Sequence, residues 1–76
     1  MIVVALGAVH HHAAVPLLIP MLTSDDPSLR GSAAWSLGAL RAHDAAPALE
    51  AALRVEQVWY PRARMQVALA ELNADK

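Results

Sequence analysis

The four histidines are the residues of this chain best suited to hold a metal ion. His10, His11 and His12 are consecutive, and His43 follows 31 residues after His12. Three consecutive histidines cannot all face one ion from a regular helix, although His10 and His12 in a turn would leave a place for His43 as third ligand. The spacing of 31 is also that of an internal repeat, described below, which places His12 and His43 in neighbouring loops about 10 Å apart. We therefore expect solvated loop histidines, no metal ion and no other cofactor.

Other catalytic chemistry has little support in the sequence. The chain has no cysteine, no glycine-rich phosphate loop and no Gly-x-Ser-x-Gly motif, and its carboxylates are scattered without an obvious pair. Lys and Arg total 6 and Asp and Glu total 7, so a formal net charge of -1 offers no electrostatic footprint for nucleic acid. These observations indicate a protein that is not an enzyme, and they disfavour nucleic acid as a partner.

The elements that would position any site begin with an apolar stretch. The first formally charged side chain is Asp25, which raises the question of a signal peptide or a membrane span. A signal peptide starts with basic residues, which this stretch lacks, and a span needs about 20 unbroken apolar residues. The histidine run, Pro16 and Pro20 interrupt this one. We therefore expect no membrane insertion and a soluble, cytoplasmic protein.

An internal repeat is the most informative feature of the chain. Matching residues recur at a spacing of 31, and the pattern continues toward the C-terminus at a spacing of 32. The pairs at 31 include Leu6 and Leu37, Gly7 and Gly38, His12 and His43, Pro16 and Pro47, and Leu22 and Leu53; those at 32 include Arg30 and Arg62, Leu37 and Leu69, and Leu40 and Leu72. We predict one domain over residues 1–76, with an orphan helix at 1–10, a first helical hairpin at 12–41 and a second at 43–73.

Local signals predict five helices and no strand. The expected ranges are about 2–9, 13–22, 26–41, 43–54 and 59–73, from cap and turn residues. The third helix starts near Asp26 or Pro27, because a carboxylate is favoured at a helix N-terminus. Tyr60 is expected to be pushed toward an extended shape by the proline that follows it.

The third and fifth helices each separate a buried side from a second face. At about 100° per residue, the expected buried side of the third helix is Leu29, Ala33, Leu37 and Leu40. The expected buried residues of the fifth helix are Met65, Ala68, Leu69 and Leu72. The second face consists of Ser28, Gly31, Ser32, Trp35 and Ala39 on the third helix and Tyr60, Ala63, Arg64, Val67 and Glu71 on the fifth, with Trp59 beside it.

These residues carry a family resemblance. The pattern Ala13-Ala14-Val15-Pro16, Leu22, Asp26, Leu29-Arg30, Ala33-Ala34 and Leu37-Gly38 resembles the HEAT-like repeats of the phycobilisome-lyase type. The resemblance extends over nearly the whole chain. It implies an all-α fold, an α-α superhelix or solenoid of about five helices in two and a half repeats.

The resemblance also assigns roles to positions. It implies that the second helix of each hairpin lines a concave binding surface and that the Leu-Arg and Leu-Gly pairs are structural. Pro61 and Ala70 depart from this pattern in the last repeat, as terminal repeats often do. Arg30 and Arg62 occupy equivalent positions, and we expect them to tie neighbouring loops or to reach acceptors such as Asp26.

The second face is the predicted partner-binding surface. The resemblance places it on the concave side, and aromatic residues and arginine dominate binding hot spots. The predicted contact residues are Trp35, Trp59, Tyr60, Arg64, Ser32 and Val67. The simpler interpretation is that the aromatic rings pack on neighbouring helices instead.

We therefore expect a non-catalytic protein–protein interaction or scaffold module. Its partner is another protein that the sequence does not identify. One alternative is an accessory subunit of a lyase-like enzyme, which the family name alone implies. The other is a HEAT-like module that binds nucleic acid.

The N-terminal end is predicted to be an interface between copies. The orphan helix is apolar all round, and Leu17 and Met21 lie off the neighbouring apolar stripe at positions where the next repeat has alanine. Terminal repeats normally have a polar outer surface, so an apolar end implies a covering partner. The expected interface of a homo-oligomer, most simply a homodimer, is Ile2, Val3, Leu6, Leu17 and Met21. A truncated longer solenoid is the alternative.

Overall fold

The computed structural model describes residues 13–74, and within that range the chain is helical and contains no strand. Its elements are a helix at residues 13–21, α2 at Pro27–Ala39, a short 3-10 helix η1 at His43–Ala45, α3 at Ala46–Val55 and α4 at Trp59–Ala74. The all-α prediction is confirmed. The first predicted helix, at 2–9, lies outside the described residues.

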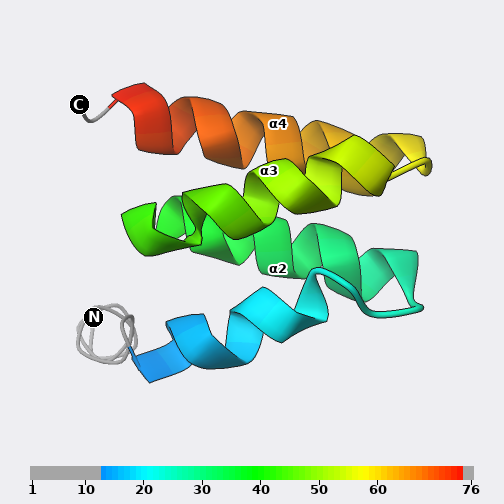
Figure 1. The fold of residues 1–76 in the computed structure, drawn as a ribbon, viewed down its shortest axis with the longest axis horizontal. Helices are drawn as coiled ribbons and strands as arrows, with labels where there is room; N and C mark the ends of the chain where they lie inside the picture. Colours follow the sequence, from blue (N-terminus) through cyan, green and yellow to red (C-terminus); the bar gives the residue numbers. More distant parts are fainter. Residues whose placement is uncertain (1–12, 75–76) are drawn as a thin grey trace, which may run out of the picture.

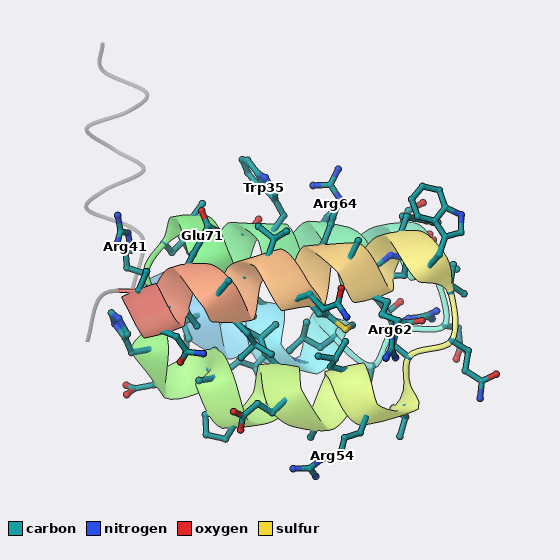
Figure 2. The ribbon with its side chains drawn as sticks, turned by 90° about the horizontal axis from the view of Figure 1, so that it is seen from above. Trp35, Arg41, Arg54, Arg62, Arg64 and Glu71 are labelled. Carbon is teal, nitrogen blue, oxygen red and sulfur yellow. The ribbon has the colours of Figure 1, made fainter. Side chains whose placement is uncertain are left out.

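The helices form two layers. In one layer α2 and α4 run parallel, and in the other the helix at 13–21 and α3 run in the opposite direction (Figure 1 and Figure 2). The core lies between the layers and consists of Leu22, Ala33, Ala34, Leu37, Ala42, Ala45, Leu49, Ala52, Met65, Ala68 and Leu72. Because about half of these residues are alanine, the helices approach closely, which suits the alanine-rich composition.

Both ends of α2 are capped by local hydrogen bonds. Asp26 is the N-cap, and its Oδ1 accepts a 2.8 Å hydrogen bond from the backbone N–H of Ser28. At the other end Arg41 has a φ of 58°, and the N–H groups of Arg41 and Ala42 donate back to the carbonyls of Gly38 and Leu37. This is the Schellman arrangement, with arginine in the left-handed position that glycine usually takes. The N-cap at Asp26 confirms the predicted start of this helix near Asp26 or Pro27.

Three expectations about single residues are wrong. Tyr60 lies inside the first turn of α4 rather than in extended backbone. Pro61 is tolerated there because the first N–H groups of a helix have no partner within it. Leu29 is 42% exposed, because the side of α2 on which it lies is turned away from α4. Gly31 is buried, because it faces α4 instead of belonging to the open second face.

Leu40, also expected in the core, is only half-buried, because α2 ends before it and it forms the C-cap, whereas the other core predictions agree with the structure. Ala33, Leu37, Met65 and Leu72 are at most 1% exposed, and Leu69 is half-buried against the same cluster. None of the helices in the described part of the chain is both long and apolar enough to cross a membrane.

Candidate functional site

Close packing of α2 on α4 builds the surface on which the predicted binding residues lie. Gly31, Ala34 and Gly38 of α2 are buried. A Cβ atom at Gly38 would lie 2.9 Å from the Cα of Ala68, and one at Gly31 would lie 3.5 Å from the Cα of Pro61. The backbones of the two helices therefore approach so closely at Gly38 that any larger residue would displace them.

Two charged side chains of α4 lie across these glycines. The Cδ of Arg64 is 3.3 Å from the position of a Gly31 Cβ, and the Oε1 of Glu71 is 2.7 Å from that of a Gly38 Cβ. Seven residues separate Arg64 from Glu71, which is about 10 Å along the helix axis. Figure 2 shows both projecting on the same side of the molecule as Trp35, which stands between them in that view.

Trp35 and Val67 form the apolar centre of this surface. Trp35 is 56% exposed and Val67 is 54% exposed. The glycine contacts set the register of the two parallel helices and place Trp35 level with Val67. Ser32 is also exposed, about one turn before Trp35. The name α2–α4 face is used below for Ser32, Trp35, Arg64, Val67 and Glu71.

Trp59 and Tyr60 lie at one end of the α2–α4 face. Their rings meet edge to face with centroids 5.8 Å apart, and the Tyr60 hydroxyl is 3.2 Å from the Oγ of Ser28, which ties the start of α4 to the start of α2. Trp59 is 79% exposed. Val67 follows eight residues later, so about 12 Å along the axis separates the pair from the centre of the face. The structure therefore does not gather the three aromatic rings into one cluster.

The predicted interface between copies is described only in part. Leu17 is 72% exposed, whereas Met21 is half-buried and packs against the core. Ile2, Val3 and Leu6 lie outside the described residues. Of the two described side chains, Leu17 is the one that presents its surface to solvent.

A buried ion pair that the sequence did not reveal joins the loops at one end of the molecule. Arg30 donates from Nε to Oε1 of Glu56 at 2.7 Å and from Nη2 to Oε2 at 3.0 Å. Arg30 also donates to the carbonyl of Ser24 at 2.8 Å, and the N–H of Val58 donates to Glu56 at 3.1 Å. Arg30 therefore ties neighbouring loops, as predicted, but its acidic partner is Glu56 and not Asp26.

This pairing holds both groups in their charged forms. The side chain of Glu56 is 3% exposed and that of Arg30 is 17% exposed. The hydrogen bond from Arg30 lowers the pKa of the Glu56 carboxyl below its ordinary value, against the opposing effect of burial. The same hydrogen bond raises the pKa of the Arg30 guanidinium. Neither group is available as a general acid or base near neutral pH.

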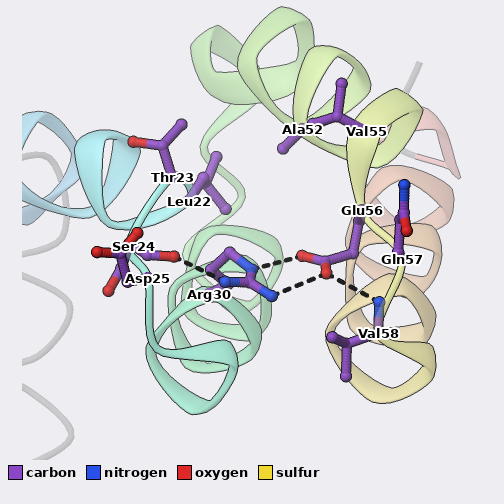
Figure 3. Close-up of a pocket in the computed structure, with 10 residues that line it drawn as sticks. All are labelled: Leu22, Thr23, Ser24, Asp25, Arg30, Ala52, Val55, Glu56, Gln57 and Val58. Atoms are coloured by element: carbon purple, nitrogen blue, oxygen red, sulfur yellow. Dashed lines mark hydrogen bonds and ion pairs between the residues drawn. The ribbon is translucent and has the colours of Figure 1, made fainter.

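A pocket of about 360 Å³ opens beside the ion pair (Figure 3). Its walls come from the loop after the helix at 13–21 and from the end of α3 with the loop that follows. Leu22, Ala52 and Val55 supply apolar surface. Because Arg30 and Glu56 already bond to each other, these two charges in the wall are neutralised before any ligand enters.

Metal ligation has no support among the described residues. Within residues 13–74 no three histidine or acidic side chains come together in a way that would hold an ion. His10, His11 and His12 lie outside that range, so the expectation about them stays a prediction.

Comparison with known families identifies the repeat. A family model of HEAT repeats matches residues 1–70. The chain belongs to the HEAT-repeat family. No curated protein and no solved structure gave a match. The HEAT-like fold that the sequence predicted is confirmed, whereas its phycobilisome-lyase type stays a prediction.

The HEAT-repeat assignment explains how the described elements relate to each other. The helix at 13–21 and α2 form one hairpin, and α3 and α4 form the next, with α2 and α4 as the second helices. The Arg30–Glu56 pair is thus a bond between successive HEAT repeats. A HEAT repeat contacts chiefly its neighbours, so this bond and the α2–α4 packing together fix how the two repeats stack.

Proposed function

We propose that this HEAT-repeat chain is a protein–protein interaction or scaffold module that binds its partner through the α2–α4 face without catalysis. The observation that best supports this proposal is Trp35, which is 56% exposed in the middle of a helix. Tryptophan is among the residue types most enriched in binding hot spots. The charged groups that the described residues bring together, Arg30 and Glu56, neutralise each other, which favours binding over acid–base chemistry.

The rigidity of the surface favours affinity. Gly31 and Gly38 allow α2 to pack tightly on α4, so the backbone beneath Trp35 is held on both sides. Ordering interface groups costs about 0.5–1.5 kcal/mol for each flexible side chain that binding immobilises. A surface fixed in advance by helix packing avoids part of that cost.

The charges around Trp35 indicate what the partner presents. Arg64 and Glu71 flank the apolar centre formed by Trp35 and Val67. A complementary surface has an apolar side chain over that centre, an acidic group near Arg64 and a basic group near Glu71. Such charge pairs at the rim add specificity and speed association more than they add affinity.

A pull-down from the native host, followed by titration of the purified partner, tests this proposal. Trp35→Ala should weaken binding by roughly tenfold or more, because a central aromatic anchor is lost. Arg64→Ala should weaken binding less and make it less sensitive to salt. Arg54→Ala is the matched control, because Arg54 is an exposed arginine on the opposite side of the molecule (Figure 2).

Two outcomes would contradict the proposal. Equal recovery of the same proteins by the wild type and by Trp35→Ala would show that the α2–α4 face is not the binding surface. Binding to duplex DNA that weakens steeply with salt would instead support the nucleic-acid alternative. Melting curves of all variants should be measured first, so that loss of binding is not loss of fold.

We also infer that copies associate through the N-terminal end. Leu17 is 72% exposed, whereas its repeat equivalent, Ala48, is half-buried and packs against the core. Leu29 is 42% exposed, whereas its equivalent Pro61 is fully buried against α2. A covering copy would remove this apolar surface from water. Light scattering should show association that Leu17→Glu abolishes, and a stable wild-type monomer at micromolar concentration would contradict the inference.

A further inference from the structure

The open sides of α2 and α4 carry two matching rows of residues. The α2 row is Ser28, Ser32, Trp35 and Ala39, and the α4 row is Tyr60, Arg64, Val67 and Glu71. Within each row the residues are four, three and four positions apart. All of them are exposed except Tyr60, which is half-buried. Alternating steps of four and three are the spacing at which helices pack along each other in coiled coils.

The two rows lie level with each other. The hydroxyls of Ser28 and Tyr60 are 3.2 Å apart at one end, and the glycine contacts place Trp35 level with Val67. The rows therefore form four layers, which are Ser28 with Tyr60, Ser32 with Arg64, Trp35 with Val67, and Ala39 with Glu71. Because helices pack with their axes about 8–10 Å apart, a third helix along the seam would contact both rows.

The layers differ in chemistry in a fixed order. Arg64 and Glu71 each stand beside a small residue of α2, Ser32 and Ala39 respectively. Each small residue leaves room for a long side chain of an occupant, whose stem would cover it and whose charge would meet the arginine or the glutamate. Between these layers lies the apolar pair of Trp35 and Val67. The complementary order is a basic, then an apolar, then an acidic side chain.

The distances between layers select a helix over an extended segment. Starting from the layer of Glu71, the other three layers lie about 6, 10.5 and 16.5 Å along the axis. An occupant helix reaches them at its fourth, seventh and eleventh following residues, which share one face. A strand advances about 3.3 Å per residue, so it reaches the last two layers at odd-numbered residues. Those side chains would point away from the surface.

Helix dipoles select the direction of the occupant. The helices α2 and α4 run parallel (Figure 1), so their negative C-terminal ends lie together near Glu71. A helix has its positive end at the N-terminus, so an antiparallel occupant brings unlike ends together. Its N-terminal part then lies beside Glu71. The basic residue therefore comes first along the occupant, the apolar residue four positions later and the acidic residue seven positions later.

We propose that the α2 row and the α4 row bind one amphipathic helix of a partner protein, antiparallel to α2 and α4, with basic, apolar and acidic residues at these spacings. The inference rests on the proposed function of the α2–α4 face. It adds the secondary structure, the residue spacing and the direction of the segment that the face binds.

Peptide libraries test the proposal without knowledge of the natural partner. Peptides of about 20 residues in an alanine and glutamine host form some helix alone. Four positions with the spacing of the rows are randomised, and peptides that bind Trp35→Ala are removed before selection on the wild-type chain. Selected peptides should carry basic, apolar and acidic residues in that order from the N-terminus. A second library in an extended host, randomised at every second residue, should give no enrichment.

Two further measurements use a peptide from that selection. A proline at its centre should weaken binding by roughly 100-fold, because proline disrupts a helix. The double variant Arg64→Glu with Glu71→Arg keeps the net charge of the chain and should prefer the peptide whose basic and acidic residues are exchanged. The matched control is Glu50→Arg with Arg54→Glu on α3, where both side chains are exposed. It should leave the original preference unchanged.

Several results would overturn the proposal. They are enrichment from the extended library only, no enrichment from either library, the reverse order of charges, and equal binding by the proline-containing peptide. The pull-down separates this failure from that of the proposed function. If Trp35→Ala still loses the natural partner there, the α2–α4 face binds a segment that is not this helix. If that variant retains the partner, the proposed function fails as well.

Discussion

Gly38 is the residue on which the closest approach of α2 and α4 depends. A Cβ there would lie 2.7 Å from Glu71 Oε1 and 2.9 Å from the Cα of Ala68, and the backbone contact cannot be relieved by a side-chain rotation. Gly38→Ala should therefore lower the free energy of unfolding by about 1–3 kcal/mol, as overpacking does. Urea denaturation measures the change.

Gly31→Ala is the matched control for that substitution. Its Cβ would meet the flexible stem of Arg64 at 3.3 Å and the backbone of Pro61 at 3.5 Å, which is ordinary contact. Alanine is also favoured over glycine in a helix by about 1 kcal/mol. Gly31→Ala should therefore be neutral or stabilising, and equal destabilisation at both glycines would contradict the packing described here.

Glu56 makes stability depend on pH in the acid range. Its pKa is lowered in the folded protein by the hydrogen bond from Arg30, so the unfolded chain takes up the proton first. The contribution is fully present above the ordinary glutamate pKa of about 4.3 and is lost as pH falls from there toward the folded pKa. Urea midpoints across this range should fall more steeply for the wild type than for Glu56→Gln. Glu50→Gln, at an exposed position, should leave the profile unchanged.

Residues whose role follows from their own helix could be predicted from the sequence, and residues that depend on another segment could not. The exposure of Trp35 follows from periodicity within one helix, and the structural role of Gly38 was implied by the family resemblance; both agree with the structure. The Arg30–Glu56 bond spans 26 residues and joins two loops. The sequence offers several acids within reach of an unplaced arginine, so it could not single out Glu56.

At the scale of the helices, Asp26 sets where α2 begins. Its carboxylate accepts from the N–H of Ser28, and Pro27 follows it at the first helical position. Asp26→Ala should destabilise the protein by about 1 kcal/mol, because a helix donor loses its partner. Asp26→Asn retains an acceptor and should cost much less, so a similar loss in both variants would show that charge rather than capping is responsible. Thermal unfolding measured at one pH distinguishes the two.

The predicted starts of α2 and α4 agree with the structure, but the extended backbone expected for Tyr60 was wrong because two local rules compete there. The start of α2 follows from Asp26 and Pro27. At the start of α4, the bias of a residue before proline toward extended backbone competes with the tolerance of the first helical turn for proline, and the helix includes Tyr60. The hydrogen bond between the hydroxyls of Tyr60 and Ser28 of α2 supports that outcome from outside the helix, which no local rule anticipates.

At the scale of the whole molecule, burial depends on where a repeat stands in the stack. Leu29 and Pro61 are repeat equivalents, yet Pro61 is buried against α2 and Leu29 is 42% exposed. Likewise Gly31 is buried and its equivalent Ala63 is exposed. A helical wheel treats equivalent positions alike, so it cannot show which side of a helix has a neighbouring repeat.

Stacking also predicts how the described part of the molecule opens. In repeat proteins, stability is approximately a sum of repeat and neighbour terms. Among the labelled helices, α2 and α4 make the most extensive contact, so they should open as one unit. Native-state hydrogen exchange should show similar protection for amides in both helices, namely those of Ala33, Ala34 and Leu37 in α2 and of Ala68 in α4. Their protection should be well above that of Asn73.

The variant Gly38→Ala tests this coupling. It should lower protection in α2 and α4 by the same free energy that urea denaturation reports. If protection falls in α4 while α2 keeps its own, then α4 detaches separately, and the contact between the two helices is not what makes the fold cooperative.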